Sequence, residues 1–348
     1  MFKVETRLFE KADLKSIKEC AHIIQSGGIV AFPTETVYGL GADALNPKAV
    51  DRIFLAKGRP NDNPLIIHLH NLDSLDLYVK DIPEVFFTLS KLFMPGPLTV
   101  ILKKRDIIPD NVTAGLDTVA LRIPDNQIAL SLIEYSNRPL AAPSANISGK
   151  PSPTTYDHVV EDLNYRVDAI INGGKTQIGM ESTVLDLTQE PPVILRPGGI
   201  SFNSLKLVIK DLERAYDLKE ESPKSPGMKY KHYAPNAPMY IVKGKQEHMV
   251  KKIQSLIKEK SGLLVSKETF DMYESKNKLC VGSLLDPLEI ASNIFESLRL
   301  FDKMDIDEIY CEYFEIGDMQ DTVMNRLLKA AANKIIDADS QDSVHCQP

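Results

Sequence analysis

Residues 57–68, KGRPNDNPLIIH, are the part of the chain around which we expect the fold to be organised, because a helix is expected to end there, a dense turn follows and a strand begins. Gly58 is the expected end of the helix, because glycine readily adopts the left-handed conformation that terminates helices. The run of Leu, Ile and Ile at residues 65–67 is typical of a buried strand. We therefore interpret Lys57 and Arg59, two cations at this turn, as the floor of an anion-binding site.

An alternative explanation of the two cations stays open on the sequence alone. Lysine and arginine at the C-terminus of a helix also stabilise it by interacting with the helix macrodipole. The helix is well marked, because Asn46 is a favourable cap, Pro47 suits the first helical position and apolar residues follow at helical spacing. Whether Lys57 and Arg59 bind an anion therefore depends on what else lies near them.

On both sides of residues 57–68, the sequence predicts an α/β fold in which helices alternate with short apolar strands. In the first part of the chain we expect helices over residues 14–26, 46–57, 83–93 and 125–135, and strands over 28–32, 65–67, 98–102, 119–123, 139–142, 168–171, 181–186 and 193–196. From residue 239 onward, strands and helices again alternate, which favours a small parallel sheet. We find no catalytic constellation in that second part.

The loop expected at Pro33–Gly41 follows a strand and shows neither helical nor strand periodicity. It contains hydroxyl groups, including Thr36, together with a carboxylate and two glycines, and such loops are suited to contacts with small molecules. A plain connecting loop is the alternative, because single hydroxyls in loops commonly cap turns.

A second loop of small residues, at 143–149, follows the strand that ends near Ala142. Ser144 and Asn146 offer a hydroxyl and an amide, and the small neighbours leave the backbone open to close approach by a ligand such as a phosphate. The loop matches neither the P-loop pattern nor the dinucleotide-binding glycine pattern, so a nucleotide site here would be of another kind. An Asx-type turn is the alternative interpretation.

Polar or charged residues lie at the ends of several predicted strands. Arg122 is the one charge in an apolar strand, and an edge strand with a solvent-exposed face would also explain it. Several polar strand ends in one α/β domain favour a shared binding cleft. The residues concerned are Arg59, His68, Arg122, Ser144, Ser182 and Arg196.

Residues 216–238 change in character, because charges, prolines and glycine occur there without periodicity, as in a linker. A passive spacer has no need for the Met, Tyr and His residues clustered at 228–233. We expect Ser225–Pro235 to act as a lid over the cleft, with Tyr233 reaching a nucleotide. A proline-stiffened spacer whose aromatic residues pack against one domain is the alternative.

The composition of the whole chain limits the number of domains and the class of protein. A length of 348 residues suits two domains, and 43% hydrophobic with 26% charged residues is typical of a soluble globular protein. No apolar run approaches membrane-spanning length and no signal peptide is visible, so we expect a cytoplasmic protein. The four cysteines form no CxxC pair, which argues against a zinc site or a disulfide framework.

Taken together, Pro33–Gly41, Lys57–His68, Ala141–Gly149 and Ser225–Pro235 resemble the threonylcarbamoyl-AMP synthase family in its longer form. The resemblance implies a twisted mixed sheet in a YrdC-type catalytic domain and a small parallel Rossmann-like domain. It assigns residues 1–211 to the catalytic domain, 212–238 to a linker or lid, and 239–348 to the C-terminal domain.

The family's activity is the condensation of L-threonine, bicarbonate and ATP to threonylcarbamoyladenylate and pyrophosphate. The resemblance implies that the product passes to a tRNA threonylcarbamoyl-transfer machinery, for the adenosine beside the anticodon. It places Lys57, Arg59, Ser144 and Asn146 at the catalytic site. The ATP contacts it implies are Arg59, Asn63, Thr118, Ser144, Ser152, Arg196 and Tyr233, and the threonine contacts are Thr36, His68, Arg122, Ser182 and the backbone at Ala142.

The residue chemistry agrees with this resemblance. A carbamate oxygen that attacks the α-phosphate concentrates negative charge on several oxygens, which calls for cations and oriented donors more than for a strong base. Arg122 suits the threonine carboxylate, since a guanidinium can bind both of its oxygens. We also expect Mg²⁺ to accompany ATP, although the sequence shows no cage of carboxylates for it.

Two other classes of function stay open on the sequence. The first is an RNA-binding module without catalysis. The net charge of −7 speaks against it, because binding to phosphates requires a stripe of surface Lys and Arg. The second is a related carbamoyl-transfer enzyme, but such enzymes carry zinc-finger cysteines, and this chain has none at metal-binding spacing.

Overall fold

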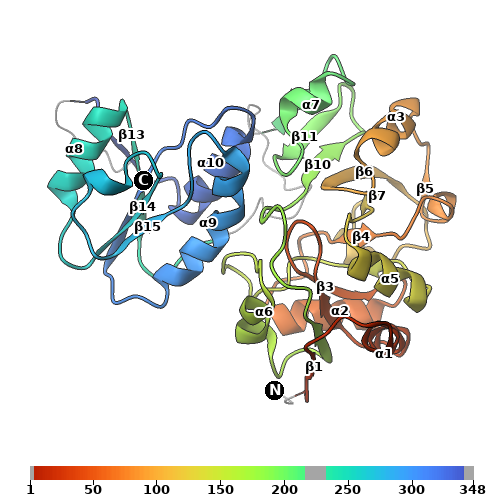
Figure 1. Ribbon diagram of the computed structural model, residues 1–348. Coiled ribbons are helices and arrows are strands. Elements are labelled where there is room, and N and C mark those ends of the chain that lie inside the picture. The colour runs from red at the N-terminus through yellow and green to blue at the C-terminus, as the bar shows by residue number, and fades with distance from the viewer. Residues whose placement is uncertain (1–3, 216–232, 341–348) are drawn as a thin grey trace. The chain divides into compact units, whose positions relative to one another are not determined.

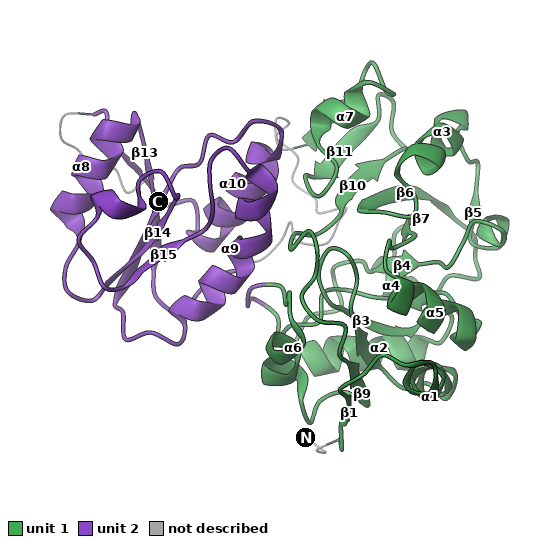
Figure 2. Ribbon diagram, viewed as in Figure 1, with its two compact units in different colours: residues 1–148, 152–229 green, residues 149–151, 230–348 purple. Residues whose placement is uncertain are grey.

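The computed structural model describes residues 4–215 and 233–340, which form two compact units (Figures 1 and 2). Unit 1 comprises residues 1–148 and 152–229, and unit 2 comprises 149–151 and 230–348. Within unit 2, two hydrogen bonds hold the short segment 149–151. The Ala234 amide donates to the Gly149 carbonyl at 3.2 Å, and the Arg299 guanidinium donates to the Pro151 carbonyl. The boundaries expected at 211 and 238 stay predictions, and most of the predicted linker lies outside the described residues.

Unit 1 is built on a twisted sheet of parallel and antiparallel strands, as the sequence predicted. Its order is β1-β9-β2-β3-β8-β4-β7-β6-β10-β11-β12, with β5 paired to β6. The strands are β1 (Arg7–Phe9), β2 (Val30–Phe32), β3 (Gly39–Asp43), β4 (Ile66–His68), β5 (Val79–Lys80), β6 (Leu98–Lys104), β7 (Thr118–Arg122), β8 (Leu140–Ala141), β9 (Ala169–Ile171), β10 (Thr183–Asp186), β11 (Val193–Arg196) and β12 (Glu213–Arg214).

The α-helices described in unit 1 are α1 (Leu14–Gln25), α2 (Pro47–Lys57), α3 (Glu84–Phe93), α4 (Asp110–Thr113), α5 (Gln127–Ser136), α6 (Tyr156–Leu163) and α7 (Phe202–Lys206). Helix α2 begins and ends as expected. The Asn46 side chain accepts hydrogen bonds from the amides of Lys48 and Ala49, and Gly58 has a φ of 61°, in the left-handed region. The helix therefore delivers Lys57 and the turn after it to a fixed place beside the sheet.

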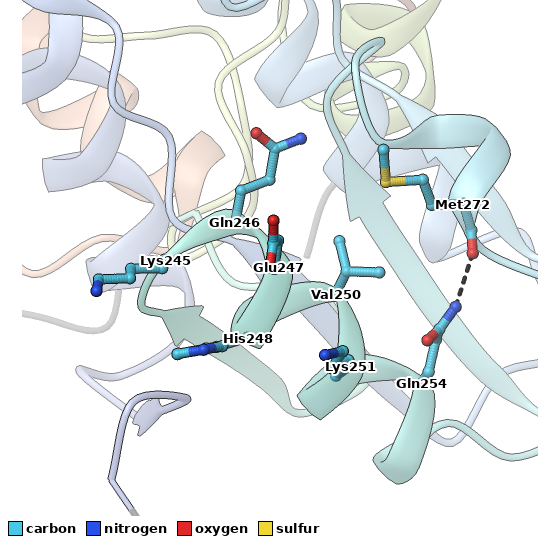
Figure 3. A pocket seen from close by; sticks show the side chains of 8 residues that line it. All are labelled: Lys245, Gln246, Glu247, His248, Val250, Lys251, Gln254 and Met272. Carbon is cyan, nitrogen blue, oxygen red and sulfur yellow. Dashed lines mark hydrogen bonds between the residues drawn. The ribbon is translucent and has the colours of Figure 1, made fainter.

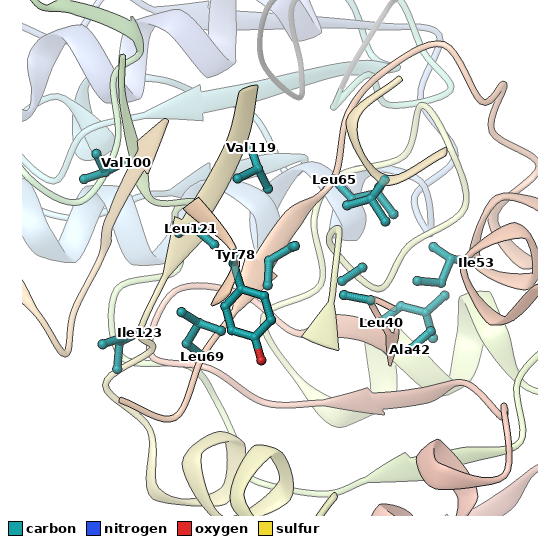
Figure 4. Close-up of a cluster of buried hydrophobic side chains, with 14 of the residues drawn as sticks. Leu40, Ala42, Ile53, Leu65, Leu69, Tyr78, Val100, Val119, Leu121 and Ile123 are labelled. Atoms are coloured by element: carbon teal, nitrogen blue, oxygen red, sulfur yellow. The ribbon is translucent and has the colours of Figure 1, made fainter. Parts of the chain in front are cut away.

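The alternation of side chains along β7 separates the core from the candidate site. Val119, Leu121 and Ile123 belong to the main hydrophobic core (Figure 4), whereas Ala120 packs with Ile66 in a smaller cluster. Thr118 and Arg122 alternate in step with Ala120 and so share its face. Because β7 lies between β4 and β6 and Arg122 is buried, the edge-strand explanation of this arginine is wrong.

Strand β3 corrects the expectation that Pro33–Gly41 has no regular structure, because its last three residues begin a strand paired with β2 and β8. Glycines are disfavoured in strands, which hid the pattern. Here they are required by packing, since a Cβ at Gly41 would lie 2.7 Å from the Phe32 ring. The short elements β1, β5, β12, α4, α6 and α7 were also not predicted.

Unit 2 contains an all-parallel sheet of five strands in the order β15-β14-β16-β13-β17, which confirms the expected parallel α/β arrangement. Its elements are β13 (Met239–Lys243), α8 (Gln246–Leu256), β14 (Ser261–Val265), β15 (Lys278–Cys280), α9 (Pro287–Phe301), β16 (Glu308–Glu312), α10 (Gln320–Ala330) and β17 (Ile335–Asp337). Strand β17 was not predicted, because its apolar part consists of Ile335 and Ile336 alone, too short a run to indicate a strand. Across the described ranges of the chain, no helix is long and apolar enough to cross a membrane.

Candidate active site

Lys57 at the end of α2 holds the loop that contains Ser144 and Asn146. Its ammonium donates hydrogen bonds to the carbonyl oxygens of Ser144 and of Asn146, the latter at 2.6 Å, and lies 3.4 Å from Asn146 Oδ1. Ser144 Oγ donates to the same Oδ1 at 2.6 Å. Lys57 is 2% exposed, so these contacts, rather than a solvated helix end, explain its position. The structure thus brings together residues 57–68 and 143–149, two of the segments identified from the sequence.

Arg59 and Asn63 lie in the turn between α2 and β4. The Arg59 guanidinium donates to the carbonyl of Asn63 at 2.9 Å and fixes the turn. Asn63 is buried, and its side-chain oxygen accepts no hydrogen bond from the described residues. Thr118 begins β7, and because Ile66 of β4 pairs with Ala120, Thr118 is level with the residue that follows Asn63. These three residues therefore lie near one end of the β4–β7 pair.

Arg122 and His68 lie at the opposite end of the same two strands, where they are register partners. Arg122 Nη2 donates to Thr36 Oγ1 at 2.8 Å, and Nε donates to the Gly96 carbonyl at 3.3 Å. The same Nη2 lies 2.7 Å from Glu35 Oε1. Thr118 and Arg122 are four residue steps apart, which corresponds to about 13 Å along the strand. The two ends of the β4–β7 pair are therefore far enough apart to contact two different reactants.

His68 is buried beside Arg122, and both its burial and the neighbouring positive charge favour the neutral form of the imidazole. Burial lowers the pKa of His68 to about 3, and the positive charge of Arg122 lowers it further in the same direction. Its Nδ1 lies 3.2 Å from the Ile66 carbonyl, and the ring meets Phe32 edge-on. The imidazole is therefore neutral and can exchange hydrogen bonds with an uncharged group such as a hydroxyl.

Ser182 and Arg196 form a third part of the site on neighbouring strands. Arg196 donates to the Ser182 carbonyl at 2.9 Å and reaches Ser182 Oγ at 3.2 Å. Ser182 Oγ also lies 2.7 Å from Thr99 Oγ1. Because Val100 pairs with Leu121, Thr99 is opposite Arg122, which connects this group to the end of the β4–β7 pair where Arg122 and His68 lie. A Cβ at Gly198 would lie 2.3 Å from the Ser182 backbone, so glycine is needed for this approach.

The remaining predicted residues of unit 1 are placed by the same loops. The Ala142 amide donates to the Ile66 carbonyl at 2.9 Å, so the backbone at Ala142 runs beside β4. Ser152 Oγ donates to Glu181 Oε1 at 2.7 Å, and Glu181 immediately precedes Ser182. Loop 33–41 joins the two ends, because Thr36 contacts Arg122 while Gly39 forms a bridge to Ser144.

Tyr233 belongs to unit 2 and is the first residue of the described range 233–340. Its ring packs against Phe295, with centroids 5.1 Å apart, and the Arg326 guanidinium lies 5.7 Å from its centroid. Residues 225–232, the greater part of the expected lid, lie outside the described residues. The contact between Tyr233 and ATP and the closing of a lid both stay predictions.

Glu35, Thr99 and Glu181 were not assigned to the site from the sequence, although the structure places each beside a predicted residue. Glu35 could have been suspected, because it lies between two threonines in a loop that follows a strand. The other two give no local signal, since only strand pairing and loop packing bring them near Ser182 and Ser152.

A separate surface pocket lies over α8 in unit 2, lined by residues from Lys245 to Gln254 and by Met272 (Figure 3). It contains none of the predicted site residues. Nearby, His248 Nδ1 and the Lys245 amide both contact Asp339, so a carboxylate of the chain itself covers the start of the helix. In the described part of the chain, no group of three His, Cys, Asp or Glu residues could hold a metal ion.

Comparison with known proteins agrees with this geometry. Residues 22–198 match the family model described as telomere recombination, and residues 200–332 match the C-terminal domain of threonylcarbamoyl-AMP synthase. A threonylcarbamoyl-AMP synthase of Pyrococcus abyssi is 47% identical over 332 residues, which cover 94% of this chain and 97% of the relative. One of Bacillus subtilis is 44% identical over 329 residues, covering 92% and 94%.

The fold has a solved counterpart as well. The crystal structure of P. abyssi Sua5 complexed with L-threonine superposes with a TM-score of 0.89 at 46% identity, covering 95% of this chain and 98% of that one. Fold and relatives together define an enzyme of the nucleotidyltransferase class. The chain belongs to the threonylcarbamoyl-AMP synthase family.

Proposed function

We propose that this enzyme condenses L-threonine, bicarbonate and ATP to L-threonylcarbamoyladenylate and pyrophosphate. The observation that carries the proposal is the buried group of Arg122, Thr36 and neutral His68 at one end of the β4–β7 pair. At the other end are the cationic turn and the 144–146 loop. A relative 46% identical to this chain was crystallised with L-threonine, which supports the same substrate here.

In this proposal the amino acid binds at the end that contains Arg122. The guanidinium binds the threonine carboxylate, because charge-assisted hydrogen bonds to a planar carboxylate are among the strongest available to a side chain. His68, being neutral, exchanges a hydrogen bond with the threonine hydroxyl without competing for the carboxylate. Thr36, Ser182 and the backbone at Ala142 enclose the substrate.

ATP binds at the other end. Arg59, Ser144 and Arg196 bind the phosphate oxygens, and Asn63, whose buried oxygen has no protein donor among the described residues, accepts a hydrogen bond from the adenine amino group. Thr118, Ser152 and Tyr233 complete the nucleotide contacts. Lys57 and Asn146 hold the loop at Ser144 in place.

The chemistry then follows from position and charge. The threonine amine attacks the carbon of bicarbonate, a C–O bond breaks and water leaves, which gives a carbamate. A carbamate oxygen then attacks the α-phosphate of ATP while the bond to pyrophosphate breaks. Negative charge builds up on the phosphate oxygens, and preorganised cations and donors stabilise it. A small site also brings the two anionic reactants together, which solution disfavours.

We further propose that the product supplies a tRNA threonylcarbamoyl-transfer machinery in the cytoplasm. Mg²⁺ would arrive with ATP, bound to its phosphate oxygens. The site residues described above are mainly cations, hydroxyls and amides, which do not suit a resident Mg²⁺ ion, so no step is assigned to it.

The test is pyrophosphate release by the purified full-length protein. We expect release only when ATP, L-threonine and bicarbonate are all present, and little release when L-serine or L-valine replaces L-threonine. Release that is independent of threonine or of bicarbonate would contradict the proposal. Tight, salt-sensitive RNA binding without ATP turnover would instead support a binding module.

A further inference from the structure

Glu35 is a buried carboxylate without an adequate partner. Its side chain is 2% exposed, and neither of its oxygens accepts a hydrogen bond from the described residues. The nearest cation is Arg122, whose Nη2 lies 2.7 Å from Oε1 but lacks the alignment of a hydrogen bond and donates to Thr36 instead. The second oxygen, Oε2, has no such contact within the described ranges of the chain.

A buried carboxylate of this kind destabilises the folded protein unless a hydrogen-bond donor or a positive charge compensates it. Burying a carboxylate without hydrogen bonds is strongly unfavourable, and an unsatisfied buried group in a native protein calls for an explanation. One misaligned guanidinium does not satisfy two carboxylate oxygens. A ligand that brings an N–H donor and a positive charge would do so.

The side chain of Glu35 is not needed to shape its own loop. The Glu35 carbonyl already accepts a hydrogen bond from the Ile178 amide at 2.8 Å. The loop is further fixed by Thr34, whose hydroxyl donates to the Val37 carbonyl at 2.6 Å. Arg122, for its part, is held by Thr36 and Gly96. A purely structural role therefore explains the position of the loop but not the buried charge.

We propose that Glu35 binds the α-ammonium group of L-threonine. The inference rests on the proposed function, in which Arg122 binds the substrate carboxylate. A guanidinium and a carboxylate side by side are complementary to a zwitterion, because the ammonium and carboxylate of an α-amino acid are joined through a single carbon. Each end of the substrate then meets an opposite charge, and the two oxygens of Glu35 gain hydrogen-bond donors that the described residues do not supply.

This assignment predicts that the enzyme recognises the amino group and not only the carboxylate and hydroxyl. (R)-3-Hydroxybutanoate is the matched probe, since it keeps the threonine carboxylate and hydroxyl and lacks only the amine. The full-length protein should bind L-threonine much more tightly than this analogue, and that preference should depend on the charge of Glu35.

The experiment is isothermal titration calorimetry of both ligands against the wild type, Glu35→Gln and Glu35→Asp, without ATP. Glu35→Gln should weaken L-threonine about ten- to a hundredfold, the range for a hydrogen bond to a charged group, and (R)-3-hydroxybutanoate by less than about threefold. Glu35→Asp keeps the charge but withdraws it by one methylene, so it should give a smaller loss, again confined to L-threonine. Glu84→Gln, at an exposed glutamate in the first turn of α3, should leave both affinities unchanged.

The outcomes separate the possibilities. Equal weakening of both ligands by Glu35→Gln would show that Glu35 only positions Arg122 and would overturn the inference, as would no weakening of either. Wild-type protein that binds no L-threonine would overturn the proposed function and the inference with it. If Glu35→Gln fails to fold, as judged by circular dichroism, the comparison of ligands on Glu35→Asp decides in the same way.

Discussion

His68 and Arg122 are register partners at the ends of two parallel strands, both buried, with the imidazole neutral and the guanidinium charged. Under the proposed function, this pairing would offer L-threonine two different recognition groups within a single strand spacing. The guanidinium would bind the carboxylate, and the neutral imidazole would not compete for it.

His68 should make the stability of the protein depend on pH in acid. Its pKa in the folded state is about 3, below the ordinary value of 6.5, so only the unfolded state takes up the proton between these values. Stability is therefore unaffected above about pH 6.5 and falls as the pH drops toward 3, by up to about 1.4 kcal/mol per pH unit. His68→Gln should remove this dependence, measured by urea unfolding between about pH 6 and 4. His70→Gln, at a half-exposed histidine, is the control, and a wild-type slope that survives in His68→Gln would contradict the prediction.

Arg122→Lys should impair threonine binding with little effect on ATP. Lysine keeps the charge but loses the planar pair of donors, including the hydrogen bonds to Thr36 and Gly96. We expect the KM for L-threonine to rise by at least about tenfold, equivalent to about 1.4 kcal/mol, measured by pyrophosphate release. Arg105→Lys, at an exposed arginine of unit 1, should match the wild type. A rise in the KM for ATP, without a rise in the KM for L-threonine, would contradict the assignment of Arg122 to the threonine-binding end of the site.

Lys57→Met should reduce both stability and activity. The ammonium bonds two carbonyl oxygens in a buried place, and each oxygen left without a donor costs about 1 to 3 kcal/mol. The 144–146 loop would lose its support, so ATP-dependent turnover should fall at least about a hundredfold, by analogy with the loss of a preorganised donor. Lys48→Met, at an exposed position of the same helix, should change neither property.

Arg59→Ala distinguishes a catalytic cation from a structural one at the same turn. This side chain contacts carbonyls of the turn and lies less deeply than Lys57, so we expect folding to be retained and turnover to fall by about 2 to 4 kcal/mol in transition-state free energy. The measurement is kcat/KM for ATP alongside thermal unfolding. Full activity in this variant would show that Arg59 only interacts with the dipole of α2.

Gly198→Ala should destabilise the protein through Ser182. The added Cβ would lie 2.3 Å from the carbonyl carbon of Ser182 and from the amide nitrogen of Thr183, so one of the two chains must move. We expect a loss of about 2 kcal/mol or more in the free energy of unfolding, together with weaker threonine binding. Gly174→Ala is the matched control. Its φ is +76° with open space around it, so only the conformational cost of about 1 kcal/mol applies.

Elements with strong local signals could be predicted from the sequence. Asn46, Pro47 and Gly58 define the ends of α2 by capping and backbone preference, which depend only on neighbouring residues. The apolar runs of β4, β6, β7 and β11 were recognisable for the same reason. The small loop at 143–149 was identified from its composition.

Which of these segments meet, and which groups each charged side chain contacts, could not be predicted from the sequence and depends on the folded structure. Lys57 and Ser144 are 87 residues apart, and nothing local in the sequence requires their contact. The same holds for Arg122, whose burial in a central strand follows from the order of the sheet, and for Glu35, whose buried charge depends on the strand it faces. Strand order is set by the free energy of the whole packed core, so residues that depend on it carry no local pattern.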